Sequence, residues 1–158
     1  MKTIAALFAA LLSACASYDG FTLHPGASEA EVRRVMGAPA MEFTLADGSR
    51  ELVYPRGPLG VQTFMAIVAP DGTLRRIDKA LAEDTFNRIQ PGMTKDGVLR
   101  LIGPPGETMH FARTNTTAWD YRFIDQWGYP AIFSVILDDA SEKVVSKFTQ
   151  RIERDKGR

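Results

Sequence analysis

Apolar side chains recur at i, i+3 and i+4 in two short segments of the chain, near residues 32–36 and near residues 98–102. This spacing places them along one face of a helix, and that face must be buried. Ser28 precedes the first segment and Thr94 precedes the second, and both residue types are favoured helix N-caps. The pattern therefore predicts two short amphipathic helices that begin after Ser28 and after Thr94.

Both predicted helices end at the same kind of signal. Gly37 and Gly103 follow the last apolar positions and suit the left-handed C′ position of a helix, and Pro39 and Pro105 then prevent the helix from continuing. A further segment, 80–89, has apolar residues near one face and predicts another helical turn or two before the second of these helices.

Alternating and β-rich patterns, typical of strands, follow each helix. Asp-Gly pairs at 47–48 and 71–72 favour tight turns between neighbouring strands. The predicted strands lie near 41–45, 50–54, 61–69, 73–77, 107–112, 118–124, 131–137 and 143–149.

The two halves of the chain match each other at an offset of 66 residues. Pro25-Gly26 falls over Pro91-Gly92, and the Gly-x-Pro signal that ends each helix falls in the same register. We interpret the match as a duplication, with a first repeat at 23–79 and a second at 80–150. The predicted fold class is α+β: two tandem repeats, each a short helical hairpin packed on an antiparallel sheet of three to four strands.

The amino terminus has the layout of an export signal. One lysine precedes an apolar run too short to span a bilayer, and small residues lead to Cys15. Leu12-Ser13-Ala14-Cys15 resembles the lipobox of bacterial lipoproteins, in which the cysteine is acylated and the signal is cut just before it. We therefore expect a signal peptide at 1–14, lipidation at Cys15 and an acylated linker at 15–22. Lipoproteins of this type usually stay in the inner membrane only when an acidic residue follows the cysteine, so with Ala16 at that position the resemblance implies transport to the outer membrane.

Composition narrows the classes of function. The 19 basic residues equal the 19 acidic ones, which removes the summed positive charge that drives nucleic-acid binding. The single cysteine excludes an intrachain disulfide and a multi-cysteine metal cluster. We predict no cofactor and no metal. The alternating charges of 151–158 predict a solvated tail.

The sequence offers no constellation for catalysis. His24 and His110 occupy unmatched positions in the two repeats, and no nucleophile elbow occurs. Gly57-Pro58-Leu59-Gly60 lacks the Lys-Ser/Thr pair of a phosphate-binding loop and is interpreted as a strand connection. We therefore predict that the protein is not an enzyme.

Aromatic residues are the candidate partner-binding groups. Alternation places Trp119 and Tyr121 on one sheet face, where they belong either to the core or to a binding surface. Trp127 and Tyr129 fall in a predicted loop beside Gly128, and aromatic side chains offered from loops are favoured anchors of protein interfaces.

The order Pro-Gly-x-Ser/Thr, then Gly-x-Pro, then a meander with an aromatic strand resembles the SmpA/OmlA, or BamE-like, family of small outer-membrane lipoproteins. The tandem arrangement also resembles the β-lactamase-inhibitor-protein fold. The first resemblance implies a lipid-anchored, periplasm-facing, non-enzymatic binding module that supports outer-membrane or envelope protein assembly. Its partner would be a protein such as a component of the β-barrel assembly machinery. The second implies the alternative, an inhibitor of a periplasmic enzyme such as a β-lactamase or a protease.

Overall fold

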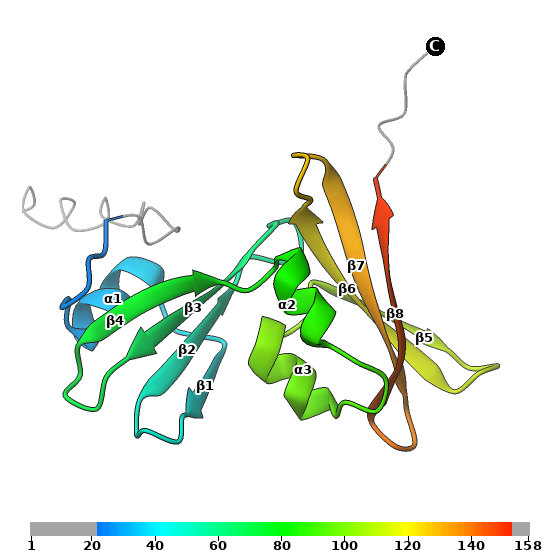
Figure 1. Ribbon diagram of the computed structural model, residues 1–158, viewed down its shortest axis with the longest axis horizontal. Coiled ribbons are helices and arrows are strands. Elements are labelled where there is room, and N and C mark those ends of the chain that lie inside the picture. Colours follow the sequence, from blue (N-terminus) through cyan, green and yellow to red (C-terminus); the bar gives the residue numbers. More distant parts are fainter. Residues whose placement is uncertain (1–21, 153–158) are drawn as a thin grey trace, which may run out of the picture.

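The computed structural model describes residues 22–152, which form two antiparallel sheets and three short helices (Figure 1). The sheets have the strand orders β1-β2-β3-β4 and β5-β6-β7-β8. The elements are α1 (Glu29–Met36), β1 (Met41–Thr44), β2 (Arg50–Pro55), β3 (Thr63–Val68), β4 (Leu74–Lys79), α2 (Glu83–Arg88), α3 (Lys95–Ile102), β5 (Glu107–Phe111), β6 (Thr116–Ile124), β7 (Pro130–Asp138) and β8 (Lys143–Arg151).

The predicted α+β class, with a helical hairpin in each repeat, is wrong. Residues 22–152 are mostly β, and their three helices account for 17% of the structure. In the described part of the first half only α1 precedes the sheet, whereas α2 and α3 both precede the second sheet. The reason is length: the Gly-x-Pro signals stop α1 and α3 after eight residues, while β6, β7 and β8 each extend over nine.

The two halves share the same backbone connection between helix and sheet. In the first half Gly26 donates its N–H to the Leu74 carbonyl at 2.8 Å, and in the second Gly92 donates to Val144 at 2.8 Å. Ser28 forms an isolated bridge with Thr73, as Thr94 does with Lys143. Each connection ties the segment before a helix to the start of the last strand of its sheet.

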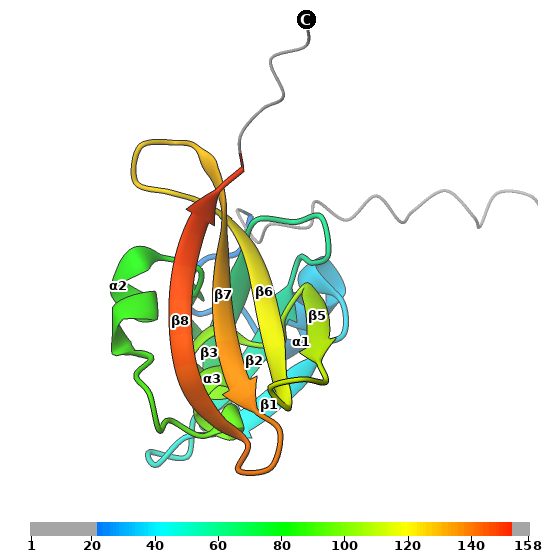
Figure 2. The same cartoon turned by 90° about the vertical axis from the view of Figure 1, so that its right-hand side faces the viewer.

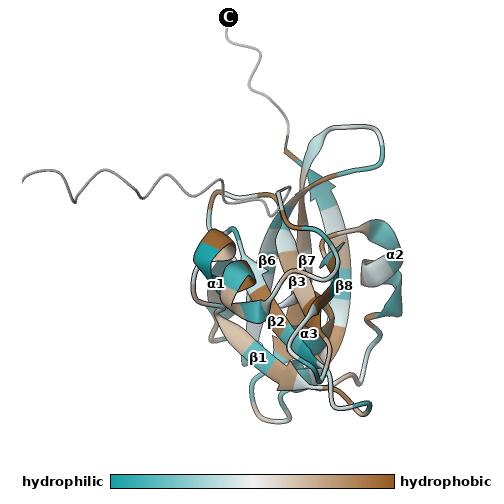
Figure 3. Cartoon of the chain, turned by 90° about the vertical axis from the view of Figure 1, so that its left-hand side faces the viewer, coloured by the Kyte–Doolittle hydropathy of each residue, from teal (hydrophilic) through white to brown (hydrophobic). Residues whose placement is uncertain are grey.

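The predicted N-caps are confirmed. The Ser28 hydroxyl accepts from the Glu31 N–H at 3.2 Å, and the Thr94 hydroxyl accepts from the Gly97 N–H at 3.1 Å. These bonds satisfy donors that the first turn of a helix leaves without an intrahelical partner. In Figure 3 α1 carries hydrophilic and hydrophobic bands, as its amphipathic pattern predicts.

The predicted positive φ of the two helix-ending glycines is confirmed, but the left-handed helical conformation is not. Gly37 has φ 86° and ψ −165°, and Gly103 has φ 75° and ψ −169°. These angles belong to an extended region that is essentially restricted to glycine. The chain leaves each helix extended because the Gly-x-Pro segment leads directly into the first strand of the sheet.

Helix α3 lies between the two sheets, in the core of the protein (Figure 1). One face of the first sheet packs on α1 through Leu52 and Tyr54. Its other face contributes Val53 and Met65 to a second cluster, which they share with both later helices and the inner face of the second sheet. The first sheet is therefore covered on both faces, as the all-buried strand β3 shows.

Candidate binding surfaces on the second sheet

The loop between β6 and β7 is built around Asp125. One carboxylate oxygen of Asp125, Oδ1, accepts the backbone N–H groups of Trp127 and Tyr129, both at 2.9 Å. The Asp125 backbone also donates to the Tyr129 carbonyl at 2.9 Å, and Gly128 supplies the positive φ of 82°. An Asp followed by Gly within a short connection is a local turn signal, so the sequence itself encodes this loop.

Arg151, at the end of β8, completes the loop structure. Its Nε donates to the second Asp125 oxygen at 2.7 Å. Its guanidinium carbon lies 4.8 Å from the centre of the Trp127 ring and 4.9 Å from that of Tyr129, within cation–π range. Desolvation by itself would raise the pKa of Asp125, but the N–H groups of Tyr129 and Trp127 and the Arg151 guanidinium hold that pKa below its ordinary value.

The two loop aromatics are both exposed and held in place. Trp127 is 65% exposed and Tyr129 is 56% exposed. Their backbones are bound to Asp125 and their rings contact Arg151, so little side-chain freedom remains to be lost when they contact something else. The loop therefore presents a pre-ordered aromatic pair to its surroundings.

Trp119 and Tyr121 belong to the core, which is one of the two interpretations that the sequence left open. Trp119 is 8% exposed and Tyr121 is 1% exposed. The Tyr121 hydroxyl donates to the Gly103 carbonyl at 3.0 Å, and burial raises the pKa of this phenol far above its ordinary value. Of the four aromatic residues predicted to bind a partner, the structure leaves Trp127 and Tyr129 at the surface.

The outer face of the second sheet carries exposed apolar residues that the sequence analysis did not single out. Figure 2 views the molecule from this side, with β8, β7, β6 and β5 in front. Met109 is 53% exposed and lies opposite Ala118, which in turn lies opposite the half-buried Ile136. Phe148 is 50% exposed and lies opposite Ser134. Alternation along the predicted strands indicates two faces but does not indicate which one is covered.

The corresponding face of the first sheet is the one that packs against the second half. There Val53, opposite Met41 and Met65, is fully buried. In the second sheet the matching position is Asp120, opposite Glu107 and Ser134, and the Ser134 hydroxyl donates to Asp120 at 2.5 Å. None of the described helices or strands packs on this outer face of the second sheet, which has polar residues at its centre and apolar residues around them.

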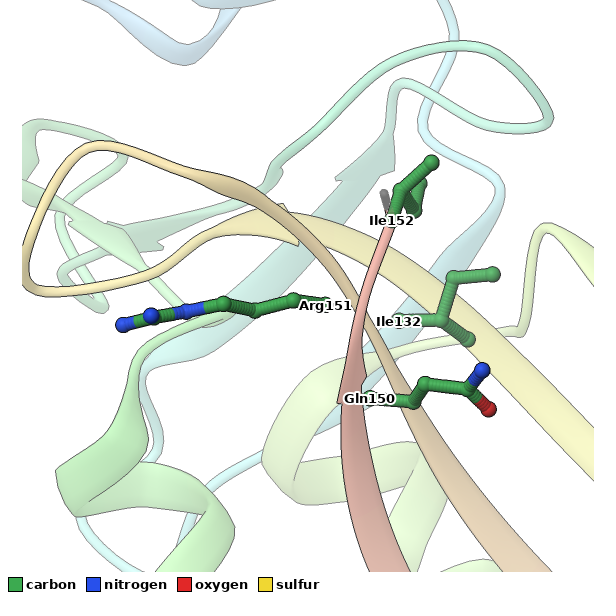
Figure 4. Close-up of a pocket in the computed structure, with 4 residues that line it drawn as sticks. All are labelled: Ile132, Gln150, Arg151 and Ile152. Carbon is green, nitrogen blue, oxygen red and sulfur yellow. The ribbon is translucent and has the colours of Figure 1, made fainter. Parts of the chain in front are cut away.

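Two shallow concavities lie near the β6–β7 loop. One, of about 530 Å³, is lined by Ile132, Gln150, Arg151 and Ile152. Figure 4 shows that the Arg151 side chain leaves β8 on the opposite side from Ile132, Gln150 and Ile152. The other, of about 470 Å³, lies between α2 and β8, where the Lys147 ammonium donates to the Phe86 carbonyl at 2.8 Å.

Side chains that bind metals do not gather in the described part of the chain. Between residues 22 and 152 no group of three or more His, Cys, Asp or Glu residues is placed to hold an ion. His110 Nδ1 lies 3.0 Å from an Asp139 carboxylate oxygen at the surface, far along the sequence from the exposed His24. No helix within these residues is long and apolar enough to cross a membrane. Cys15, the signal peptide at 1–14 and most of the tail at 151–158 lie outside the described residues.

Comparisons with known proteins give no family for this chain. No family model matches it, and no curated protein matches it. Among solved structures, it is similar to an extracellular protein containing an SCP domain from Bacillus anthracis str. Ames, with a TM-score of 0.34 and 12% sequence identity. The match covers 88% of this chain and 53% of the other, so the chain spans about half the length of that protein. The resemblance to the SmpA/OmlA family stays a prediction from motifs.

Proposed function

We propose that this chain is a lipid-anchored, non-enzymatic binding module of the cell envelope that presents the outer face of its second sheet to a protein partner. The segment Leu12 to Cys15, with its lipobox pattern, supports the anchor. The motif resemblance supports a place on the periplasmic face of the outer membrane and a role in the assembly of envelope proteins.

The observation that carries this proposal is the uncovered outer face. Several exposed apolar side chains on one uncovered face are typical of a protein interaction surface. Met109 and Phe148 lie about half exposed on this face, and the hydrogen-bonded pair Asp120 and Ser134 lies between their strands. The matching face of the first sheet is already occupied by α3, which leaves the second sheet as the one with room for a partner.

The test is photocrosslinking in living cells from single positions of the otherwise unchanged chain. A photoreactive residue replaces Met109 in one strain and Arg34, an exposed residue of α1, in the control strain. We expect a discrete crosslinked protein from position 109, and none from position 34. The same product from both positions, or no product from position 109, would contradict the proposal.

The identity of the captured protein separates the two functions that the sequence predicts. Capture of a barrel-assembly component that depends on Cys15, and is lost with Cys15→Ser, supports the assembly role. Capture of one soluble enzyme by both the wild-type chain and the Cys15→Ser chain supports the inhibitor alternative. A second substitution, Phe148→Glu, tests the same face, since a charge there would weaken an apolar contact without disturbing the core.

A further inference from the structure

Exposed apolar side chains gather at one end of the molecule, the upper end in Figures 1 and 2. Three segments meet the surface there: the loop between β2 and β3, the loop between β6 and β7, and the end of β8. They carry Leu59, 83% exposed, Trp127, 65% exposed, and Ile152, 37% exposed. Ile124, at the end of β6, is 45% exposed and adds to the same end.

The chemistry of this end suits the boundary between lipid headgroups and acyl chains. Tryptophan and tyrosine combine an apolar ring with a polar group, which favours that boundary over either water or hydrocarbon. Trp127 and Tyr129 are held apart from the core by Asp125 and Arg151, so their rings face outward in a fixed arrangement. The isoleucines and Leu59 supply purely apolar surface beside them.

The start of the described chain also lies in the upper part of Figure 1, on the side of α1 and the first sheet, apart from the loop between β6 and β7. Seven residue steps separate Cys15 from Thr22, and an extended chain spans at most about 3.5 Å per residue, so the linker reaches about 25 Å. A compact domain of this size has a diameter of about 36 Å. The linker is therefore shorter than the domain, and it allows the upper end to lie at the bilayer that holds a lipid on Cys15.

We infer that the upper end of the domain is a second membrane contact, in which Trp127, Tyr129 and Leu59 enter the interfacial layer of the bilayer that holds the Cys15 lipid. This inference rests on the lipid anchor of the proposed function and goes beyond it. The loop aromatics, which the sequence predicts as protein anchors, are then assigned to lipid. The outer face of the second sheet stays available to a protein, since it runs from the membrane toward the periplasm.

The two tryptophans of the chain provide an internal control for a test. Trp127 lies in the proposed contact, whereas Trp119 is buried in the core with the Lys95 ammonium 5.7 Å from its ring centre. The acylated full-length protein is reconstituted into phosphatidylcholine vesicles with and without bromine on the acyl chains. Bromine quenches tryptophan fluorescence over short distances. We expect the brominated vesicles to lower the emission of the wild-type protein and to leave that of Trp127→Phe, which retains only Trp119, unchanged.

Each other outcome overturns the inference. Vesicle-bound wild-type protein without quenching would show that the anchor holds and that the loop stays in water. Protein that does not float with the vesicles would show that the lipid anchor of the proposed function fails, and the membrane contact fails with it. Equal quenching of the wild-type protein and Trp127→Phe would place the signal on Trp119. A crosslink in cells from position 127 to the same protein that position 109 captures would assign the loop to that protein.

Discussion

Gly103→Ala tests how the two halves pack, because Gly37 provides a matched control. Both glycines end a helix with the same extended, positive-φ backbone. In that region any other residue costs about 1–3 kcal/mol, so alanine at either position destabilises the protein. The two sites differ in their neighbours. A Cβ on Gly103 would lie 2.9 Å from the Val53 Cγ1 and 3.0 Å from the Thr63 Cγ2, whereas a Cβ on Gly37 meets nothing within 4 Å.

The extra cost at Gly103 follows from overpacking a buried contact, which costs about 1–3 kcal/mol. We expect a free energy of unfolding lowered by about 1–3 kcal/mol for Gly37→Ala. For Gly103→Ala the sum of both costs is about 2–6 kcal/mol. At about 3–4 °C per kcal/mol for a domain of this size, the melting temperatures of the two variants differ by roughly 3–12 °C.

Urea and thermal unfolding of both variants measure this difference directly. Adding Val53→Ala to Gly103→Ala removes the closest atom, so the double variant should be less destabilised than the sum of the two single variants. Equal destabilisation by Gly37→Ala and Gly103→Ala, or strict additivity with Val53→Ala, would refute the packing of the end of α3 against the first sheet.

Three further predictions concern the core, the loop and acid stability. Phe86 stacks on Phe133 in the core, with the ring centres 3.9 Å apart. In urea titrations, Phe86→Ala should lower the free energy of unfolding by about 3–5 kcal/mol. The control Phe148→Ala, at an exposed position, should change it by less than about 0.5 kcal/mol. Asp125→Ala should speed limited trypsin cleavage after Arg151, read by mass spectrometry, because Arg151 loses its 2.7 Å hydrogen bond; an unchanged rate would contradict the loop structure. Hydrogen bonds from Arg75 and Ser49 lower the pKa of Asp47 from 3.8 to about 2. The ionised Asp47 carboxylate therefore contributes to the free energy of unfolding above about pH 4, and this contribution is lost as the pH falls toward about 2. In Asp47→Asn the free energy of unfolding should therefore fall less steeply over that pH range.

Local signals along the sequence predicted the parts of the fold that depend on local chemistry. Ser28 and Thr94 cap their helices because a hydroxyl reaches the N–H three residues on, whatever the tertiary structure. The Asp47-Gly48 turn forms for the same reason, with the Asp47 carboxylate accepting from the Ser49 N–H at 3.0 Å. Such contacts need no information about distant residues.

The class of the fold and the covering of the sheets could not be predicted from those signals. The helical patterns indicated helices but not their small share of the structure, which led to the α+β prediction. The run of apolar residues in Thr63–Val68 is the signal for a strand buried on both faces, and it points to a partner on each side of the first sheet. The outer face of the second sheet was not predicted because the alternation does not show which face the two halves pack through. They pack through the inner face, which leaves Met109 and Phe148 exposed on the outer one.

The lipid on Cys15 is the claim on which both proposals depend, and intact mass spectrometry of the protein purified from its membrane fraction tests it most directly. We predict a mature chain that begins at Cys15 and carries acyl groups on that residue, and that moves to the soluble fraction when Cys15→Ser is combined with a signal peptide of the non-lipoprotein type. A soluble wild-type protein whose mature chain carries no lipid would contradict it.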